Sequence, residues 1–392
     1  MSMSSSEKVK LVHYVSKWLA QTCVWLYDEV RFLPTPSIES HIVCDETWGL
    51  DQFSVPNIHS MQDLTWWYLY LLRVKRKLGM CEPYRFHLPL LEKVCRDTKP
   101  AILHSHFGHM GWVNAPLARK YGLKHVVSFY GADVNYIPFK DPRWLARYQE
   151  MGQLVDKVLC EGPFMAESIA KLGIPKEKIS VHRLGVDLTE FKFVPRQFRK
   201  GSRLRFLIVA SFREKKGIPV ALEALARFRN VYDDFELSII GDAFLEQDRM
   251  EKDRILQKVR DTELTSRVHF LGAQPYKKVL QEAYKHHIFL APSLTAPDGD
   301  CEGGAPVAII EMAATGMPIV STTHCDIPFV LSRQNAPYLA EERDSNGLCE
   351  AIVRLVSSEW KDLLDANRSH IDQELDAQRQ GERLGRIYQA LV

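Results

Sequence analysis

The sequence predicts an α/β fold with two doubly wound domains, each a parallel sheet covered by helices. A chain of 392 residues is too long for one ordinary core, and a hydrophobic content of 46% is enough for two. Short apolar runs alternate with helical patterns, which is typical of parallel strands joined by crossover helices. We expect domains at residues 1–195 and 196–375, and a C-terminal helix at 376–392 that packs back on the first domain.

The expected strands fall into two sets. The first set is 9–15, 40–44, 101–105, 125–129, 157–160 and 179–182, and the second is 205–210, 236–240, 268–271, 288–291 and 318–321. Between them, residues 191–202 are rich in proline, glycine and basic residues, which predicts an interdomain linker. Two domains joined there would face each other across a cleft, with ligands outside the carboxyl ends of the strands.

Composition excludes several classes of protein. The 51 basic and 49 acidic side chains leave a net charge of +2, which argues against a nucleic-acid binder. The eight cysteines include no Cys-x-x-Cys pair, which argues against a disulfide framework or zinc site and for a reducing compartment. No signal peptide and no apolar run of about 18 residues are present, so we expect a cytoplasmic protein. Gly-x-Gly-x-x-Gly and Walker A motifs are also absent.

The segment 296–322 carries the strongest functional signal. A glycine loop with Glu302, Gly303 and Gly304 precedes an apolar helix, expected from about Pro306 to about Thr315, whose one charge is Glu311. Because its other residues are apolar on every side, we expect this helix and its carboxylate to be buried. A buried carboxylate needs a partner, and a structural salt bridge is one alternative. The glycines and free N–H groups in front favour a polyhydroxylated anionic ligand instead.

Polar and glycine residues also follow other strands of the second set. Arg213, Lys215 and Lys216 stand in a turn closed by Gly217, and they are either a solvated charge run or contacts for phosphate. Two further strand ends carry Gly241 and Gln274, the latter in the loop 270–275. Each position is either part of an ordinary turn or a contact for a ligand.

In the first domain, His104, His106 and His109 follow a strand. Metal binding would need a third ligand of clear spacing, which the sequence does not offer, so we predict no metal and a loop that faces the cleft. We expect Tyr130, Gly131 and Asp133 to lie on the same side of the cleft as this loop. The pair Asp298 and Asp300 lies late in the second domain, and we interpret it as a polar loop rather than a metal motif.

Residues 64–77 are aromatic and then basic. This pattern fits a helix at a membrane surface, and equally a helix packed on a core with a basic exposed end.

Together these motifs resemble the retaining glycosyltransferases of family 4, which have the GT-B fold, with the likeness closest to bacterial exopolysaccharide enzymes of the colanic-acid type. The match covers about 104–355. It rests on the paired glutamates Glu302 and Glu311 with 312–322 after them, the turn 211–217, His182 to Asp187, and the loop 270–275.

The resemblance implies roles for individual residues. Glu311 would hold the ribose of a nucleotide sugar, and Glu302 would hold the sugar with the N–H groups of Gly303, Gly304 and Ala305. Arg213 and Lys216 would neutralise the departing diphosphate. The remaining donor contacts would be Pro306, Ser211, Gly241 and Gln274, and the acceptor side or sugar contacts would be His106, His109, Tyr130, Gly131 and Asp133.

Three departures from the family pattern stand out. Eight residues rather than seven separate the glutamates, Ser211 occupies the position of the usual arginine, and Tyr130 stands where many members have histidine. We therefore expect Arg213 to replace the arginine, and His106 or His109 to replace the histidine.

The expected function is transfer of a hexose, best taken as glucose, from a UDP-sugar to a saccharide or lipid-linked saccharide, with retention and without a metal or other cofactor. The chain would act in exopolysaccharide biosynthesis in the cytoplasm, with peripheral membrane contact through 64–77. The rivals are a glycoside hydrolase, a nucleotide-sugar epimerase of the same fold, and a non-catalytic nucleotide-sugar-binding subunit.

Overall fold

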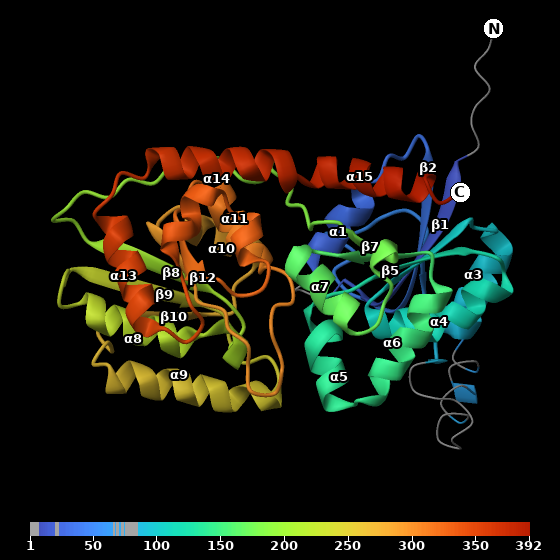
Figure 1. Cartoon of the computed structure of the whole chain (residues 1–392), viewed down its shortest axis with the longest axis horizontal. Coiled ribbons are helices and arrows are strands. Elements are labelled where there is room, and N and C mark those ends of the chain that lie inside the picture. The colour runs from blue at the N-terminus through green and yellow to red at the C-terminus, as the bar shows by residue number, and fades with distance from the viewer. Residues whose placement is uncertain (1–7, 20–22, 66, 68–69, 72–73, 75–84) are drawn as a thin grey trace, which may run out of the picture. The chain divides into compact units, whose positions relative to one another are not determined.

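The computed structural model describes residues 8–19, 23–65, 67, 70–71, 74 and 85–392. Two compact units divide the chain: residues 1–185 with 377–392, and residues 186–376. In Figure 1 the strands of each unit form a central sheet flanked by helices. The expected domain boundary at 195/196 lies inside the second unit.

The first unit contains a parallel sheet of seven strands in the order β3-β2-β1-β4-β5-β6-β7. The strands are β1 (Val9–Trp18), β2 (Ile38–Thr47), β3 (Ile58–Ser60), β4 (Ile102–His106), β5 (Lys124–Ser128), β6 (Lys157–Cys160) and β7 (Ile179–Val181). The helices are α1 (Val24–Arg31), α3 (Leu88–Thr98), α4 (Gly108–Lys120), α5 (Ile137–Lys140), α6 (Arg143–Leu154), α7 (Pro163–Lys171) and α15 (Ala377–Gln389), with a π-helical turn at Ala132–Tyr136.

The last helix, α15, completes the core on one face of this sheet. Its Leu384 and Tyr388 are fully buried among Leu11 of β1, Ile102 of β4 and Val126 of β5. The other face is covered by α3 and α4, whose apolar residues pack on Val12 and Leu103. Because side chains alternate along a strand, successive residues of β1 and β4 are shared between these two layers.

The second unit contains a parallel sheet of six strands in the order β10-β9-β8-β11-β12-β13. The strands are β8 (Leu204–Val209), β9 (Phe235–Ile240), β10 (Val268–Gly272), β11 (Ile288–Ala291), β12 (Ile319–Thr322) and β13 (Leu339–Ala340). The helices are α8 (Ile218–Phe228), α9 (Arg249–Asp261), α10 (Tyr276–Ala283), α11 (Val307–Ala314), α12 (Ile327–Val330), α13 (Ser345–Val356) and α14 (Lys361–Glu374).

Both sheets therefore confirm the predicted doubly wound α/β class. In each, the strand order reverses beside the first strand, between β1 and β4 in one unit and between β8 and β11 in the other. Such a switch point separates the loops that follow the two strands and opens a place for a ligand. The edge strands β3 and β13, of three and two residues, were not predicted.

The stretch 191–202, predicted to be a linker, packs within the second unit instead. Phe191 is buried, and the buried Arg196 guanidinium donates to the carbonyl oxygens of Ala283, His286 and Thr315. In the sequence Arg196 looks like part of a flexible linker. In the structure its hydrogen bonds fix the segment to α10 and to the end of α11.

Among the described residues, no helix is long and apolar enough to span a membrane. The sequence left open whether the segment 64–77 is a helix at a membrane surface or a helix packed on a core. Of this segment, residues 66, 68–69, 72–73 and 75–77 lie outside the described residues. Trp67, Tyr70 and Leu71 have more than half of their surface exposed.

Candidate functional site

The switch point of the second sheet brings two loops together. The turn after β8 carries Arg213 to Gly217, and the loop after β11 carries Pro292 to Pro306. The Leu294 N–H donates to the Lys215 carbonyl oxygen at 2.8 Å. Gly217 has a φ of +62°, and a Cβ there would lie 1.9 Å from the Pro292 carbonyl oxygen. Only glycine permits both this backbone conformation and this approach.

Five charged side chains meet between these loops, and we call them the ionic cluster: Arg213, Lys215, Lys216, Asp300 and Glu302. Arg213 Nη2 lies 2.5 Å from Asp300 Oδ2, and Lys215 Nζ lies 3.3 Å from Asp300 Oδ1. Lys216 Nζ lies 2.8 and 3.0 Å from the two oxygens of Glu302, and Lys215 Nζ lies 3.7 Å from Glu302 Oε2. The expected phosphate turn is therefore paired with the loop that carries Glu302.

The ionic cluster has three cations and two carboxylates, so one positive charge is left over. The carboxylate side chains are each 7% exposed, whereas Lys215, Lys216 and Arg213 are 10%, 19% and 33% exposed. The accessible part of the cluster is thus cationic. Asp300, predicted to be part of a polar loop, is instead one of its buried anions.

Glu302 is ionised in this environment. Burial would raise its pKa, but the charges of Lys216 and Lys215 outweigh burial and lower the pKa to about 2. The Ser293 hydroxyl also donates to Glu302 Oε1 at 3.0 Å. The pKa of Lys216 is lowered, because desolvation outweighs the attraction of Glu302. The carboxylate is therefore held as an anion in one position.

Glu311 differs from the expectation of a fully buried carboxylate. Its helix α11 begins at Val307, one residue after the predicted start, and Val307, Ala308 and Glu311 are partly exposed. Glu311 accepts a hydrogen bond from the Tyr276 hydroxyl at 3.3 Å. The apolar residues fill the inner face of α11, so Glu311 lies on a face that a ligand can reach.

The other residues predicted to contact the donor lie around the same sheet edge. Gly241 follows β9 with a φ of +141°, and a Cβ there would lie 1.8 Å from the Ala210 carbonyl oxygen, so this glycine allows the loop to cross the end of β8. The Gln274 amide donates to the Leu271 carbonyl oxygen of its own loop. Ser211 is partly exposed directly after β8. The segment Gly303 to Ala305 is buried in front of Pro306, which caps α11.

The first unit has a polar cluster of a different kind at its switch point. His13 of β1 pairs in register with His104 of β4, and His106 ends β4. Nδ1 of His13 lies 3.1 Å from Nε2 of His106, whose Nδ1 lies 2.8 Å from the Tyr130 hydroxyl. His104 bonds the hydroxyls of Tyr388 and Ser128 at 2.6 and 2.8 Å. We call these six residues the histidine cluster.

The histidine cluster is buried and neutral. Burial lowers the pKa of His13 to about 3 and holds those of His104 and His106 well below the usual value. His106, expected on the acceptor side, is fully buried with both ring nitrogens hydrogen-bonded. A ligand reaches it only if one of these bonds is broken.

The other predicted residues of the acceptor side form a neighbouring group. Asp133 is fully buried, with one oxygen 3.1 Å from His109 Nδ1 and the other accepting from the Tyr130 N–H. The His109 side chain is 21% exposed at the start of α4, and Gly131 immediately precedes the π-helical turn. In this group His109 is the side chain that combines a fixed position with access to solvent.

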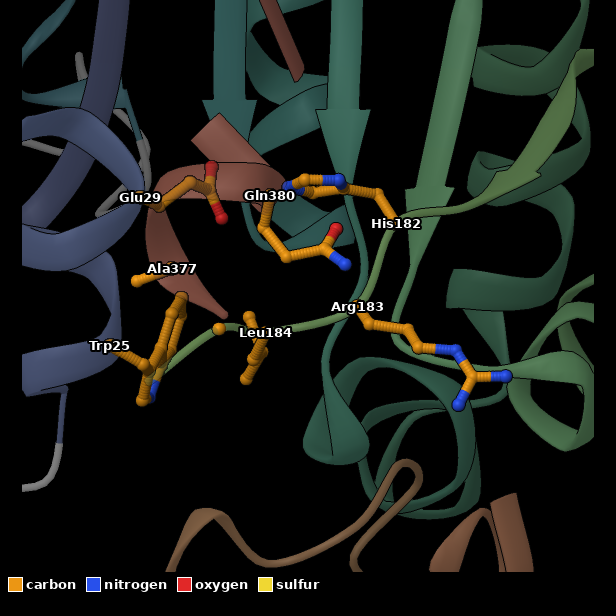
Figure 2. Close-up of a pocket in the computed structure, with 8 residues that line it drawn as sticks. Trp25, Glu29, His182, Arg183, Leu184, Ala377 and Gln380 are labelled. Atoms are coloured by element: carbon orange, nitrogen blue, oxygen red, sulfur yellow. The ribbon is translucent and has the colours of Figure 1, made fainter. Parts of the chain in front are cut away.

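A pocket in the first unit lies beside this group. Figure 2 shows the Glu29 carboxyl of α1 directed toward Gln380 of α15, whose amide end points away from Glu29, with His182 next to Gln380 and Arg183 directed away. Glu29 also lines a neighbouring pocket with Tyr130 and His182. Burial raises the pKa of Glu29 to about 8, and its Oε1 has no hydrogen-bond partner among the described residues.

Sequence reasoning missed four members of these sites, His13, Glu29, Tyr388 and Ser293, and it gave Asp300 no role beyond a polar loop. His13, Glu29 and Tyr388 lie in strands or helices whose pattern looks like ordinary core or surface, whereas Ser293 lies in a loop. One usable signal was His13, a histidine inside the apolar strand run 9–15, because a polar side chain in a buried strand needs a partner.

The sequence matches two family descriptions: Glycosyltransferase Family 4 over residues 24–190, and Glycosyl transferases group 1 over residues 203–358. It is 30% identical over 306 residues to the putative colanic acid biosynthesis glycosyltransferase WcaL of Escherichia coli K12, covering 76% of this chain and 73% of the relative. It is 32% identical to the amylovoran biosynthesis glycosyltransferase AmsK of Erwinia amylovora, covering 65% and 61%.

The fold has solved counterparts. The Anabaena protein Alr3699/HepE, crystallised with UDP and glucose, superposes with a TM-score of 0.74 at 15% identity, covering 98% of this chain and 100% of that one. At this identity the likeness establishes the fold alone. The two family matches, the WcaL relative and the paired Rossmann-like units of GT-B enzymes together place this chain in glycosyltransferase family 4.

Proposed function

We propose that the protein transfers a hexose, glucose, from a UDP-sugar to a saccharide or lipid-linked saccharide with retention of configuration, in exopolysaccharide biosynthesis. The ionic cluster is the observation that carries this proposal. Its excess positive charge and its accessible cations suit a diphosphate whose negative charge grows as the sugar departs. The WcaL and AmsK relatives are described as enzymes of colanic acid and amylovoran biosynthesis.

Within this proposal, Arg213 and Lys216 are the phosphate contacts and Glu302 is the sugar contact. Arg213 is the most exposed member of the cluster and stands two positions after Ser211. Glu302 is held as an anion by Lys216 and Ser293, so it can accept hydrogen bonds from sugar hydroxyls. The N–H groups of Gly303 to Ala305 complete the sugar site, and Pro306 offers none.

Glu311 is proposed to hold the ribose. Its carboxylate is partly exposed and accepts a long hydrogen bond from Tyr276, at 3.3 Å. A carboxylate in such a position can exchange this contact for a pair of ribose hydroxyls. Gln274 and Gly241, at the neighbouring strand ends, are proposed to border the base and phosphates.

Transfer is proposed to proceed without a metal ion on the diphosphate. Asp300 lies 2.5 Å from Arg213 and 3.3 Å from Lys215, so its charge is already balanced by cations. In the proposed mechanism these same cations take the place that a divalent ion has in enzymes with a metal-binding Asp-x-Asp motif.

The acceptor is proposed to bind the first unit. His109 and Asp133 offer a hydrogen-bonded pair of which the histidine is partly exposed, and Tyr130, Gly131 and His106 form the wall behind them. A lipid-linked acceptor would place the protein at the inner face of a membrane through residues 64–77. Flotation with liposomes should be weaker for a Trp66→Ala, Trp67→Ala double variant than for the wild type, and equal flotation would remove this part of the proposal.

The donor assignment is tested by thermal shift with UDP-, GDP- and ADP-glucose, followed by NMR of the anomeric proton of the product. We expect UDP-glucose to raise the melting temperature most, and we expect an α-linked product. Glu311→Gln should weaken UDP binding, and Glu302→Gln should abolish transfer while UDP still binds. No shift with any nucleotide sugar, or donor conversion that needs no acceptor, would overturn the proposal.

A further inference from the structure

A second cluster in the second unit contains two cysteines and a histidine. Cys301 directly precedes Glu302, whereas His324 and Cys325 lie in the loop after β12. One ligand atom of each, the two Sγ atoms and a ring nitrogen, lie within 4.8 Å of one another, and all three side chains are buried. Both cysteines are free thiols. The chain separates them by more than twenty residues, so their spacing in the sequence gave no sign of a shared site.

His324 is oriented as metal-binding histidines are. Its Nδ1 lies 2.6 Å from Glu342 Oε1, so Nδ1 carries the proton and Nε2 presents its lone pair. Nε2 lies 3.1 Å from Cys325 Sγ and accepts from the Glu302 N–H at 3.1 Å. A carboxylate on the far nitrogen fixes both tautomer and ring direction in carboxylate–histidine–zinc sites.

The two sulfur atoms are protonated thiols in the absence of a cation. Cys301 Sγ and Cys325 Sγ lie close together, and the neighbouring Cys301 thiol and burial hold the pKa of Cys325 well above its usual value. Zinc–sulfur bonds of about 2.3 Å and zinc–nitrogen bonds of about 2.0 Å place the ligands of a tetrahedron roughly 3.5–4 Å apart. Small movements of these side chains reach that geometry.

We propose that Cys301 Sγ, Cys325 Sγ and His324 Nε2 bind a thiophilic divalent cation, Zn²⁺, which joins the Glu302 loop to the loop after β12. Binding displaces the two thiol protons and releases the Glu302 N–H from Nε2, and water fills the fourth position. Two thiolates and an imidazole select zinc over Mg²⁺ or Ca²⁺, which prefer oxygen ligands. The ion would set the position of Glu302 without contacting the donor sugar.

The histidine cluster of the first unit does not offer an equivalent site. His104 and His106 use both ring nitrogens in hydrogen bonds, to Tyr388 and Ser128 and to His13 and Tyr130. A metal there would displace several of these bonds at once. At the cysteine cluster a metal would displace the thiol protons and the two contacts of His324 Nε2, with Cys325 Sγ and with the Glu302 N–H.

The test is metal binding by the full-length protein, reduced, stripped of metal and without nucleotide sugar. We expect one Zn²⁺ per chain by elemental analysis, and with Co²⁺ a thiolate-to-metal charge-transfer band in the near ultraviolet. Cys301→Ser and Cys325→Ser should lose the band, whereas Cys349→Ser, a half-buried cysteine of α13 in the same unit, should keep it. Because a buried serine hydroxyl could disturb folding, alanine variants at the same two positions serve as a second pair. Circular dichroism checks that all variants are folded.

The contact between His324 and Glu342 allows a second test, in which zinc affinity should be weakened rather than lost. Glu342→Gln should weaken zinc binding by about 10–100-fold, as loss of such a partner does elsewhere. A cobalt band that survives both cysteine variants, or a Cys301–Cys325 disulfide in a protein whose reduced form binds no Zn²⁺, would overturn the site. Because no donor is present, these results are independent of the proposed transfer reaction.

Discussion

The ionic cluster of the second unit and the histidine cluster of the first unit occupy equivalent places in two sheets of the same strand order, yet they bury polar groups by opposite means. In the ionic cluster, charges are kept and paired, so Glu302 stays ionised to about pH 2. In the histidine cluster, charge is excluded, and hydrogen bonds between rings and hydroxyls satisfy the nitrogens of His104 and His106, while Nε2 of His13 has no partner among the described residues. The same position in one fold can therefore hold either a set of paired charges or an uncharged cluster rich in hydroxyl groups.

The largest expected difference between the units is their response to acid. Burial lowers the pKa of His87, His125 and His182 to about 4 and that of His13 to about 3, with His104 and His106 well below their usual value. A histidine with a lowered folded pKa binds fewer protons when folded, so stability falls as pH drops from about 6.5 toward the folded pKa. His286 and His287 of the second unit are shifted in the same direction, but they are fewer.

Glu302 affects the stability of the second unit at a lower pH than the histidines affect the first. Its lowered pKa gives stability that is present above about pH 4.5 and is lost as pH falls toward 2. We therefore expect amide hydrogen exchange in β1 and β4 to accelerate between pH 6.5 and 4, before exchange in β8 and β11. Opening of the second unit first would contradict the assignment of neutral and charged clusters.

The next largest effect is expected from Lys216→Ala. The variant leaves the buried Glu302 with only the more distant Lys215 at 3.7 Å, and breaking a buried ion pair costs about 3–5 kcal/mol. The melting temperature measures this loss, and transfer activity should disappear with it. Lys361→Ala, which removes an exposed pair with Asp365 in α14, is the control and should leave both unchanged.

Glu29→Gln should stabilise the first unit. The carboxyl has a pKa of about 8, so the folded state holds a proton that the unfolded chain releases above about pH 4.5. Stability therefore falls as pH rises from 4.5 to 8, and the amide removes this dependence. We expect a gain of roughly 1–3 kcal/mol at pH 7 in chemical unfolding. A difference in stability between variant and wild type that is the same at pH 5 and at pH 7 would refute the buried acid.

The smallest effect is expected from Tyr388→Phe. The change removes the hydroxyl that bonds His104 Nδ1 at 2.6 Å and leaves a buried nitrogen without this partner, at a cost of about 1–2 kcal/mol. Tyr338→Phe in the second unit is a matched control, because its hydroxyl makes a longer, part-buried bond to Ser358. Equal losses in the two variants would mean that the histidine cluster has no special dependence on its hydroxyls.

The sequence predicted the sheets better than the clusters. Apolar runs located eleven of the strands, whereas β3 and β13 are too short to show a pattern. The motif around Glu302 pointed to the loop in which the ionic cluster lies, because glycines and charges follow strand ends. An apolar helix, however, does not reveal which of its faces meets solvent, so Glu311 was wrongly expected to be buried.

Contacts between residues far apart in the chain could not be predicted from a single sequence. Arg213 meets Asp300, and Cys301 meets Cys325, only because β8, β11 and β12 are neighbours in the sheet. His13 joins His104 through the register of β1 and β4. Strand order and register determine which of these residues come into contact. Neither can be predicted from the local composition of the sequence.

The central claim is that the ionic cluster binds the donor diphosphate and the histidine cluster does not. Calorimetric titration with UDP of the wild type, Arg213→Gln and Tyr388→Phe tests it directly. Arg213 is the most exposed cation of the cluster, and loss of a charged hydrogen bond of about 1.5–3 kcal/mol corresponds to at least tenfold weaker binding. We expect that loss for Arg213→Gln and unchanged affinity for Tyr388→Phe. Equal affinity of Arg213→Gln and the wild type would contradict the account.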